Sequence, residues 1–288
     1  MPIVVVTSNA PGEGKTGVAA AIARHYAYLG RATRLARIAG SETSPGAAHD
    51  AALFASFAFA PGTSASTASA SSITDPGDDA ILVVEADAAD AAIAGAKVVL
   101  VGRGSAPTAL AGVTPVATIQ TDVPVSAAHA NGATPVIRIA EDRTLAGFSV
   151  SEAKAALNAE QIVPGDGDEP TCDHLVIAPI SSDAGQPYFR RFGTKAVVVR
   201  FDKTDMHLAA MQADPSCLIL TGGRMPSDYL FDAASAKGIP VLLSRTDTEN
   251  TVIALEGVFD NTRFQGERKL DRMAALLEET ALYDALAL

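Results

Sequence analysis

The chain of 288 residues contains no tryptophan, and aromatic residues make up only 5% of it, which disfavours a surface that stacks nucleic-acid bases. Positive charge is also scarce, because 22 Lys and Arg face 33 Asp and Glu, for a formal net charge of −11. Nucleic acids and anionic membranes need a positive surface, so neither is an expected partner. The two cysteines, Cys172 and Cys217, lack the spacing of a zinc site or a disulfide framework, and buried thiols are expected.

Long hydrophobic runs are missing as well. The longest, such as residues 96–101, fall far below the length that spans a bilayer, and no basic segment precedes an apolar block at the N-terminus. We therefore expect a cytoplasmic protein. A chain of this length accommodates two domains.

The most informative feature that is present lies in residues 3–23. An apolar run leads through a glycine-bearing loop into Lys15-Thr16 and an alanine-rich segment, which predicts a strand, a loop and a helix start. Glycines let the main chain approach a phosphate, Lys15 would face the outer phosphates, and Thr16 would offer its hydroxyl to Mg²⁺. Asn9 stands where the strict pattern has glycine, and the alternative is a glycine-rich turn with a solvated lysine. The predicted nucleotide-binding residues are Asn9, Pro11, Gly12, Glu13, Gly14, Lys15, Thr16 and Gly17.

Beyond this loop, apolar runs of strand length alternate with helical segments. The predicted strands are residues 3–6, 80–84, 98–101, 113–119 and 134–139. This βαβ rhythm predicts an α/β fold with a parallel sheet and helices on both of its faces. Residues 60–78 are rich in Ser, Thr, Ala and Gly and are either a surface loop beside the nucleotide site or a linker without a chemical role.

A second, smaller α/β domain is expected to begin near residue 146. Ser149 to Glu152 resemble a capped helix start before residues 153–157, and the turn-rich tract 164–170 is a connector. Further strands are predicted at residues 175–178, 196–199, 217–220 and 241–243, followed by an amphipathic helix over 266–280 with Leu270, Met273, Leu276 and Leu277 on one stripe. The expected domains are 1–145, 146–265 and a C-terminal helical segment, 266–288.

Two carboxylates are candidate Mg²⁺ ligands beside Thr16, because this ion prefers oxygen ligands. Glu85 ends a hydrophobic run, at the strand edge where open α/β sheets bind ligands, and Asp50 opens a helix over residues 51–57. The alternatives are an ordinary strand-end carboxylate for Glu85 and a plain N-cap for Asp50. Asp87 and Asp90 follow closely and are possible substitutes for Glu85.

Residues 8–16 resemble the P-loop of dethiobiotin synthetase-like ATPases, and especially that of the N-terminal, non-catalytic region of long bacterial phosphotransacetylases. The resemblance implies a P-loop NTPase fold, ATP with Mg²⁺ held by Thr16, Asp50 and Glu85, and a homodimer with the nucleotide site near its interface. The synthetase carries a substrate-directed lysine after its second strand, where this chain has Arg37. It also carries an asparagine that reads the purine, where this chain has Thr121, so the resemblance fixes neither the carbamate chemistry nor the base.

The stretch of residues 141–251 resembles the linker and the DRTGG domain of the same phosphotransacetylases. Asp202 and Lys203 stand where the family motif has an Asp-Arg pair. A lysine at this position keeps the positive charge of arginine but loses its bidentate geometry. A Thr-Gly-Gly turn exposes N–H groups that would hold an anion, although tight strand-to-helix packing also selects glycines. The candidate anion site consists of Asp202, Lys203, Thr221, Gly222 and Gly223.

These features favour an ATP- and Mg²⁺-binding regulator or sensor, at most a slow ATPase, which acts on an enzyme that it regulates. The catalytic region of the phosphotransacetylases is not expected in this chain, so it is not predicted to be a phosphotransacetylase. The first alternative is an ATP-dependent ligase of the dethiobiotin synthetase type, with Lys15 and Arg37 as catalytic residues and Arg37 and Arg103 contacting the substrate. The second alternative is a degenerate P-loop that serves as an interaction module.

Overall fold

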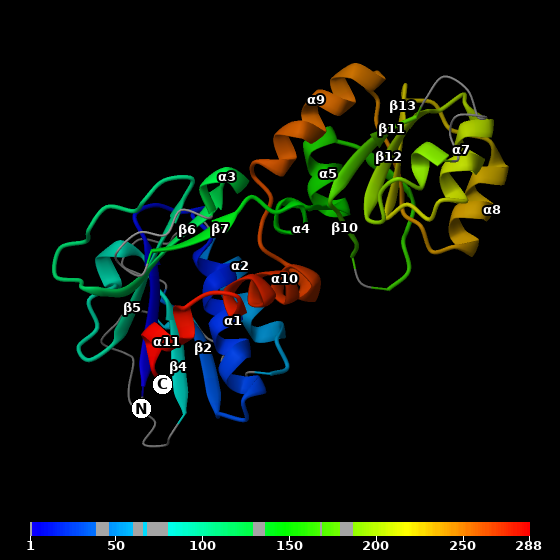
Figure 1. Ribbon diagram of the computed structural model, residues 1–288. Helices are drawn as coiled ribbons and strands as arrows, with labels where there is room; N and C mark the ends of the chain where they lie inside the picture. The colour runs from blue at the N-terminus through cyan, green and yellow to red at the C-terminus, as the bar shows by residue number, and fades with distance from the viewer. Residues whose placement is uncertain are drawn as a thin grey trace. The chain divides into compact units, whose positions relative to one another are not determined.

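The chain folds into two compact units. The computed structural model describes residues 2–38, 46–59, 66–67, 80–128, 136–167, 169–178 and 187–288. Unit 1 combines Met1–Asp142 with Phe264–Leu288, and unit 2 is Arg143–Arg263 (Figure 1). The expected loop over 60–78 lies outside the described residues, apart from residues 66–67.

Unit 1 is built on a parallel sheet of seven strands. In spatial order these strands are β3 (Ser66–Thr67), β2 (Thr33–Ile38), β4 (Ile81–Glu85), β1 (Ile3–Ser8), β5 (Lys97–Arg103), β6 (Pro115–Val123) and β7 (Val136–Ala140). Strand β1 is central, and its valines at positions 4 to 6 are fully buried. The predicted α/β fold with a parallel sheet is confirmed.

Helices flank this sheet. They are α1 (Lys15–Tyr28), α2 (Ala47–Ser56), the 3-10 helix η2 (Ala88–Asp90), α3 (Val125–Ala128), α10 (Gly266–Glu278) and α11 (Leu282–Leu286). In Figure 1 the red C-terminal helix α10 lies beside the blue helix α1. An ion pair of 2.7 Å between Arg24 and Asp271 joins these two helices. The C-terminal segment, which was expected to stand apart from both domains, therefore completes unit 1.

Several strands of unit 1 extend beyond the predicted apolar runs. β1 continues through Thr7 and Ser8, and β5 continues to Arg103, because main-chain pairing with the neighbouring strands does not stop where the side chains become polar. Both Thr7 and Ser8 are buried. The strand ends therefore carry polar groups to the carboxyl edge of the sheet.

Unit 2 contains a smaller sheet of five strands, in the order β11 (His174–Ile177), β12 (Lys195–Arg200), β13 (Cys217–Thr221), β14 (Val241–Leu243) and β9 (Glu160–Val163). Strand β9 pairs antiparallel to β14, and the other pairs are parallel. A two-stranded antiparallel pair is formed by β8 (Phe148–Ser149) and β10 (Thr171–Cys172). The helices are α4 (Arg143–Ala146), α5 (Val150–Leu157), α7 (Thr204–Met211), α8 (Asp228–Ala236) and α9 (Thr248–Phe259).

The predicted cap at Ser149 is confirmed as a capping box. The hydroxyl of Ser149 accepts a hydrogen bond from the N–H of Glu152 at 3.2 Å, and the Glu152 carboxylate accepts one from the N–H of Ser149 at 2.8 Å. These bonds satisfy N–H groups that have no partner within a helix. The same carboxylate accepts a bond of 2.7 Å from the N–H of Arg263, so the cap also ties down the end of unit 2.

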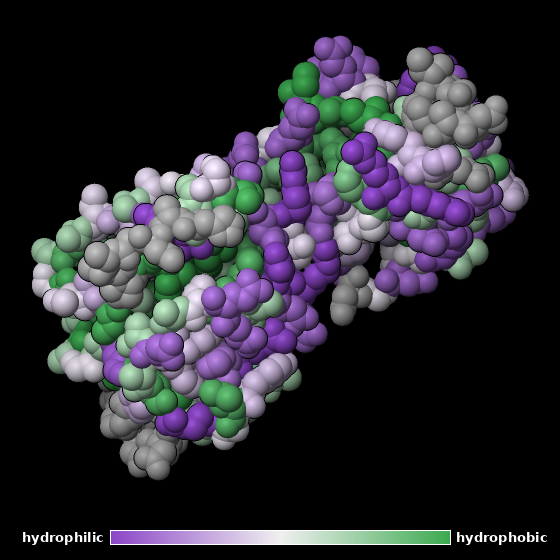
Figure 2. Space-filling model, in the orientation of Figure 1, coloured by the Kyte–Doolittle hydropathy of each residue, from purple (hydrophilic) through white to green (hydrophobic). Residues whose placement is uncertain are grey.

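The core of unit 2 holds the two cysteines. Cys172 and Cys217 are not joined by a disulfide and lie fully buried in one apolar cluster with residues such as Phe148 and Leu255. In contrast to this apolar core, Figure 2 shows hydrophilic side chains on the visible surface of unit 2, in the region that α7 and α8 occupy in Figure 1.

Over the part of the chain that the structure describes, no helix is long and apolar enough to cross a membrane.

Candidate functional site

The loop between β1 and α1 has the geometry of an anion cradle. Gly12 and Gly14 have φ angles of 81° and 94°, in the left-handed region that glycine adopts without strain. Gly14 is the N-cap of α1, and no side chain within the described residues caps this helix or places an acid in its first turn. The first N–H groups of α1 and the positive end of its dipole are therefore open to an anionic ligand.

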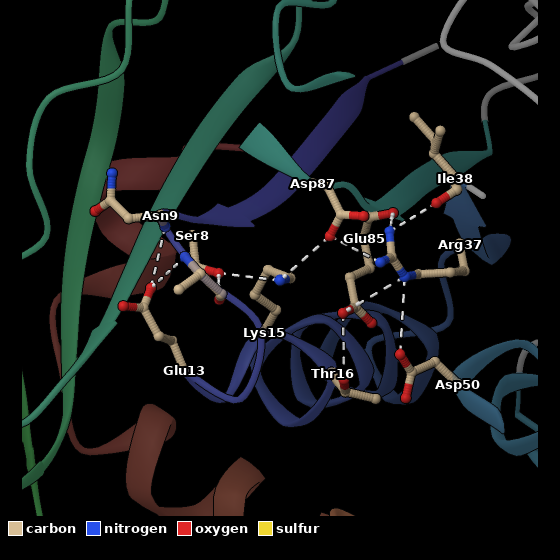
Figure 3. A network of polar contacts seen from close by, with 11 residues as sticks. Ser8, Asn9, Glu13, Lys15, Thr16, Arg37, Ile38, Asp50, Glu85 and Asp87 are labelled. Carbon is tan, nitrogen blue, oxygen red and sulfur yellow. Dashed lines mark hydrogen bonds and ion pairs between the residues drawn. The ribbon is translucent and has the colours of Figure 1, made fainter. Parts of the chain in front are cut away.

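Lys15 is held next to this loop. Its side chain is only 6% exposed, and its ammonium donates a hydrogen bond of 3.0 Å to the Ser8 hydroxyl. The same nitrogen lies 3.5 Å from Oδ1 of Asp87 (Figure 3). The cation is thus already paired at the carboxyl end of β1 and β4. Ser8 was not predicted as a site residue, and only its place at the end of the strand could have indicated it.

Glu85 and Thr16 come together as predicted from their positions. The Thr16 hydroxyl donates to Oε1 of Glu85 at 3.2 Å, while Oε2 of Glu85, which is 2% exposed, has no hydrogen-bond partner in the described part of the chain. Burial raises the pKa of Glu85 to about 7, and the nearby Asp50 carboxylate adds to this rise. The cations Arg37 and Lys15 and the Thr16 hydroxyl act in the opposite direction. The site therefore holds a carboxyl that titrates near neutral pH.

Arg37 lies near the end of β2 and is 2% exposed. Its Nη1 donates to the carbonyl oxygens of Ile38 at 2.7 Å and of Glu85 at 3.3 Å, and its Nη2 donates to Oδ1 of Asp87 at 2.8 Å. Its Nε lies 3.7 Å from both Oδ2 of Asp50 and Oε1 of Glu85. One guanidinium thus contacts three carboxylates, as Figure 3 shows.

Asp50 does not occupy the place that the sequence predicts. Helix α2 begins at Ala47 with Gly46 as its N-cap, so Asp50 lies in the first turn and the N-cap interpretation is wrong. Alanines extend the helix toward its N-terminus because they favour helix over turn. The Asp50 carboxylate instead faces Arg37.

Asn9 and Glu13 shape the loop through their own contacts. The Asn9 side chain donates to the carbonyl of Thr108 at 3.1 Å and accepts from the Thr108 N–H at 2.9 Å, which explains an asparagine where the strict pattern has glycine. The Glu13 carboxylate accepts from the N–H groups of Asn9 at 3.0 Å and Ala10 at 3.4 Å. The Thr121 hydroxyl donates to the Glu13 carbonyl at 3.1 Å. Thr108 has no sequence signal that could have predicted this role.

The remaining predicted residues of unit 1 lie at the edges of the site. Pro11 is exposed in the loop. Gly17 is buried in α1, where a Cβ atom would lie 2.8 Å from the Phe264 ring, so packing explains this glycine without a phosphate. Arg103, at the end of β5, donates to the Asp122 carboxylate at 2.9 Å.

The donors at this site fit Mg²⁺. The Thr16 hydroxyl, the unpartnered Oε2 of Glu85 and the Asp50 carboxylate are the hard oxygen ligands that this ion prefers. A group of three or more His, Cys, Asp or Glu residues arranged for a metal does not occur in the described ranges. Any ion held here would therefore rely on the Thr16 hydroxyl and on a nucleotide as further ligands.

In unit 2, the Thr-Gly-Gly turn at residues 221–223 donates two of its N–H groups to the segment that follows β14. Gly222 and Gly223 have φ angles of 96° and 67°, and their N–H groups donate to the carbonyls of Thr246 at 2.8 Å and Ser244 at 3.0 Å. A Cβ atom at Gly222 would lie 2.7 Å from the Phe201 ring. Tight packing and turn geometry therefore account for these glycines, and the N–H groups that the sequence suggested as anion donors are engaged by the carbonyls of residues 244 and 246.

The other predicted residues of unit 2 lie around this turn. Thr221 is buried, and its hydroxyl is 2.9 Å from that of Thr248. Asp202 accepts a hydrogen bond of 2.9 Å from Arg200, whose Cα pairs in register with that of Thr221. Lys203 is exposed and forms the N-cap of α7. The structure thus gathers these residues at the carboxyl edge of β12 and β13.

Two comparisons with known proteins give matches for this chain. A crystal structure of the CBS and DRTGG domains of the regulatory region of Clostridium perfringens pyrophosphatase, in complex with the activator diadenosine tetraphosphate, is similar at 15% identity and a TM-score of 0.37. The match covers 49% of this chain and 59% of that one. Residues 152–258 match the DRTGG domain family. Unit 2 therefore contains a DRTGG domain.

Proposed function

We propose that unit 1 binds a nucleoside triphosphate, with ATP as the expected ligand, and that the protein acts as a regulator or sensor of the bound nucleotide. The observation that carries this proposal is the uncapped N-terminus of α1, preceded by two positive-φ glycines and followed by Lys15 and Thr16. Backbone N–H groups that converge on one point, with a lysine beside them, form a cradle for phosphate.

Each residue of the network has a role in this proposal. Lys15 neutralises the charge of the outer phosphates, and Thr16, Asp50 and Glu85 hold Mg²⁺, which supplies further charge neutralisation when it is bound. The resemblance of the loop to dethiobiotin synthetase-like ATPases supports these assignments. It also implies a homodimer, which sedimentation at several protein concentrations will test.

The regulatory part of the proposal rests on unit 2. In the phosphotransacetylases that the chain resembles, a P-loop domain and a DRTGG domain form a non-catalytic region. Residues 152–258 of this chain match the DRTGG family. We therefore propose that unit 2 transmits the state of the nucleotide site to an enzyme that the protein regulates.

One observation favours the ligase alternative. Arg37 lies beside the P-loop, where a ligase would place a group that binds the substrate. Arg37 and Lys15 both contact Oδ1 of Asp87. Phosphoryl transfer depends mostly on positioning and charge stabilisation, so these residues would suffice for slow turnover. The intact Lys15-Thr16 pair argues against a P-loop that has lost its ligand altogether.

Calorimetric titration with ATP, GTP and ADP in the presence of Mg²⁺ tests nucleotide binding. We expect the wild type to bind, Lys15→Ala to lose binding because the phosphate charge is no longer neutralised, and Lys154→Ala to bind as the wild type does. Lys154 lies on α5 in unit 2 and serves as the matched control. Absence of binding by a folded wild type would overturn the proposal.

Turnover separates the regulator from the ligase. A regulator should hydrolyse ATP slowly and at the same rate whether or not a small carboxylate or amine is present. A ligase should accelerate strongly when its acceptor is added. A screen of such acceptors with phosphate release as the readout decides between the two.

A further inference from the structure

The guanidinium of Arg37 stands beside the carboxylates that Mg²⁺ is expected to use. Its Nε is 3.7 Å from Oδ2 of Asp50 and 3.7 Å from Oε1 of Glu85. Figure 3 shows the guanidinium directed at these two side chains and at Asp87. A divalent cation bound to both carboxylates would therefore lie next to a fixed positive charge.

We propose that Arg37 controls access of the metal to this site. In the nucleotide-free protein it neutralises Asp50 and Glu85 and so excludes a divalent cation. The metal enters together with a triphosphate, whose terminal oxygens draw the guanidinium away from these two carboxylates. This inference rests on the proposed function, because it assigns a regulatory role at the same nucleotide site.

The charge balance of the network supports exclusion of the metal. Three carboxylates are paired with two cations, Arg37 and Lys15, so two of the three negative charges that would attract a divalent cation are offset. Arginine stays protonated in proteins, so its charge cannot be removed by a change of pH. Because Arg37 and Glu85 are each only 2% exposed, water screens their interaction weakly.

The contact geometry supports exchange. Arg37 uses Nη1 and Nη2 for three hydrogen bonds, to Ile38, Glu85 and Asp87, whereas its Nε has no hydrogen-bond partner in the described chain. Oε2 of Glu85 also has none there. The guanidinium therefore meets the side chains of the expected metal ligands through its longest contacts, at 3.7 Å. Its planar fork also binds phosphate oxygens in pairs.

Such an exchange makes the binding of metal and nucleotide depend on each other. A metal that is excluded from the free protein but accepted with the triphosphate is positively coupled to it, and the coupling acts equally on both ligands. Removal of the Arg37 charge should then tighten metal binding to the free protein.

Binding of Mn²⁺ without nucleotide, followed by the electron paramagnetic resonance of the free ion, tests the proposal. Arg37→Met removes the charge and keeps a comparable length, and we expect it to bind Mn²⁺ on the order of tenfold more tightly than the wild type. Arg37→Lys keeps the charge and should remain weak. Glu85→Gln added to Arg37→Met should abolish the gain. A folded Arg37→Met that binds Mn²⁺ no more tightly than the wild type would overturn the proposal.

A second measurement applies to the wild type, in case Arg37→Met does not fold. The Nε–H resonance of Arg37 should not move when millimolar Mg²⁺ is added alone, and it should shift when Mg²⁺ and ATP are added together. A shift caused by Mg²⁺ alone, or no shift while ATP binds, contradicts the exchange. The Mn²⁺ titration uses no nucleotide, so its result is separate from a failure of ATP binding, which would count against the proposed function.

Discussion

At the scale of single residues, Glu85 is constrained by its burial and by charges of both signs. It is an almost fully buried carboxyl whose neighbours include both a like charge, Asp50, and an opposite charge, Arg37. Burial disfavours its ionised form, and this effect is the largest of those acting on its pKa. The protonation state of one side chain therefore influences the stability of the whole unit.

Glu85 predicts a pH dependence of stability. Because its pKa rises from 4.5 to about 7 on folding, this carboxyl is protonated in the folded chain but ionised in the unfolded chain between these values. Its contribution to the free energy of unfolding is fully present below pH 4.5 and is lost as the pH rises through about 7. The loss amounts to about 1.4 kcal/mol per pH unit, or about 3 kcal/mol in all.

The variant Glu85→Gln cannot titrate at this position. Its free energy of unfolding, measured with urea, should therefore rise relative to that of the wild type as the pH increases from 4.5 to about 7. A difference between the two proteins that stays constant over this range would contradict the assignment.

Part of the candidate site could be predicted from the sequence because its signals are local. The P-loop residues are contiguous, and the end of an apolar run places Glu85 at the carboxyl edge of the sheet. The contacts of Asn9 with Thr108 and of Arg37 with Asp87 could not be predicted, because they join separate segments whose side chains carry no spacing pattern. The packing of Gly17 against Phe264 could not be predicted for the same reason, since the two residues lie far apart in the sequence.

At the scale of elements, α1 packs against residues of the C-terminal segment, 264–288. Gly17 leaves room for the Phe264 ring and the end of Met273, and Arg24 pairs with Asp271 on α10. His25 stacks on Tyr283 of α11, with ring centroids 3.5 Å apart. The helix that begins at the proposed nucleotide site is thus positioned by residues from the far end of the chain.

Gly17→Ala tests this packing, and Gly257→Ala in unit 2 is the comparison without a close neighbour. Gly257→Ala, at an exposed position of α9 where an added Cβ meets no atom within 4 Å, should raise the free energy of unfolding by about 0.5–1 kcal/mol. Gly17→Ala should instead lower it, by about 1 kcal/mol, because its Cβ would lie 2.8 Å from the Phe264 ring. Phe264→Leu should reduce the cost of Gly17→Ala in a double-mutant cycle. Equal stabilisation by both alanines, measured by urea unfolding, would show that Phe264 does not constrain Gly17.

Most strands could be predicted because their apolar runs are buried on both sides. Strand β9 could not, because Glu160 and Gln161 are exposed and its pairing with β14 is antiparallel, against the rhythm of the other strands. The start of α2 was placed too late because Asp50 has the chemistry of a cap, whereas the alanine run before it continues the helix.

At the scale of the whole molecule, unit 2 is formed by one segment of the chain, whereas unit 1 is formed by two segments. Unit 2 is one continuous segment with apolar clusters of its own. Unit 1 needs residues from both ends of the chain, because α10 and α11 complete it. The two units should therefore respond differently to truncation.

A chain that ends at Arg263 should lose the structure of unit 1 and keep that of unit 2. Removal of α10 and α11 takes away the ring of Tyr283, which contacts His25 and Tyr26 on α1, so the thermal transition of unit 1 should move to a lower temperature or disappear. The isolated segment 143–263 should unfold cooperatively at the temperature of the remaining transition. A truncated chain that keeps ATP binding and both transitions of the full chain would contradict this division of the fold.

Nucleotide binding at the loop between β1 and α1 can be followed residue by residue through hydrogen exchange of the full chain with and without ATP and Mg²⁺. We expect slower exchange at the amides of residues 12–17 in the wild type and no change in Lys15→Ala, because the phosphates would accept hydrogen bonds from these N–H groups. Unchanged exchange at residues 12–17 in a wild type that binds ATP, with slowing confined to unit 2, would contradict it.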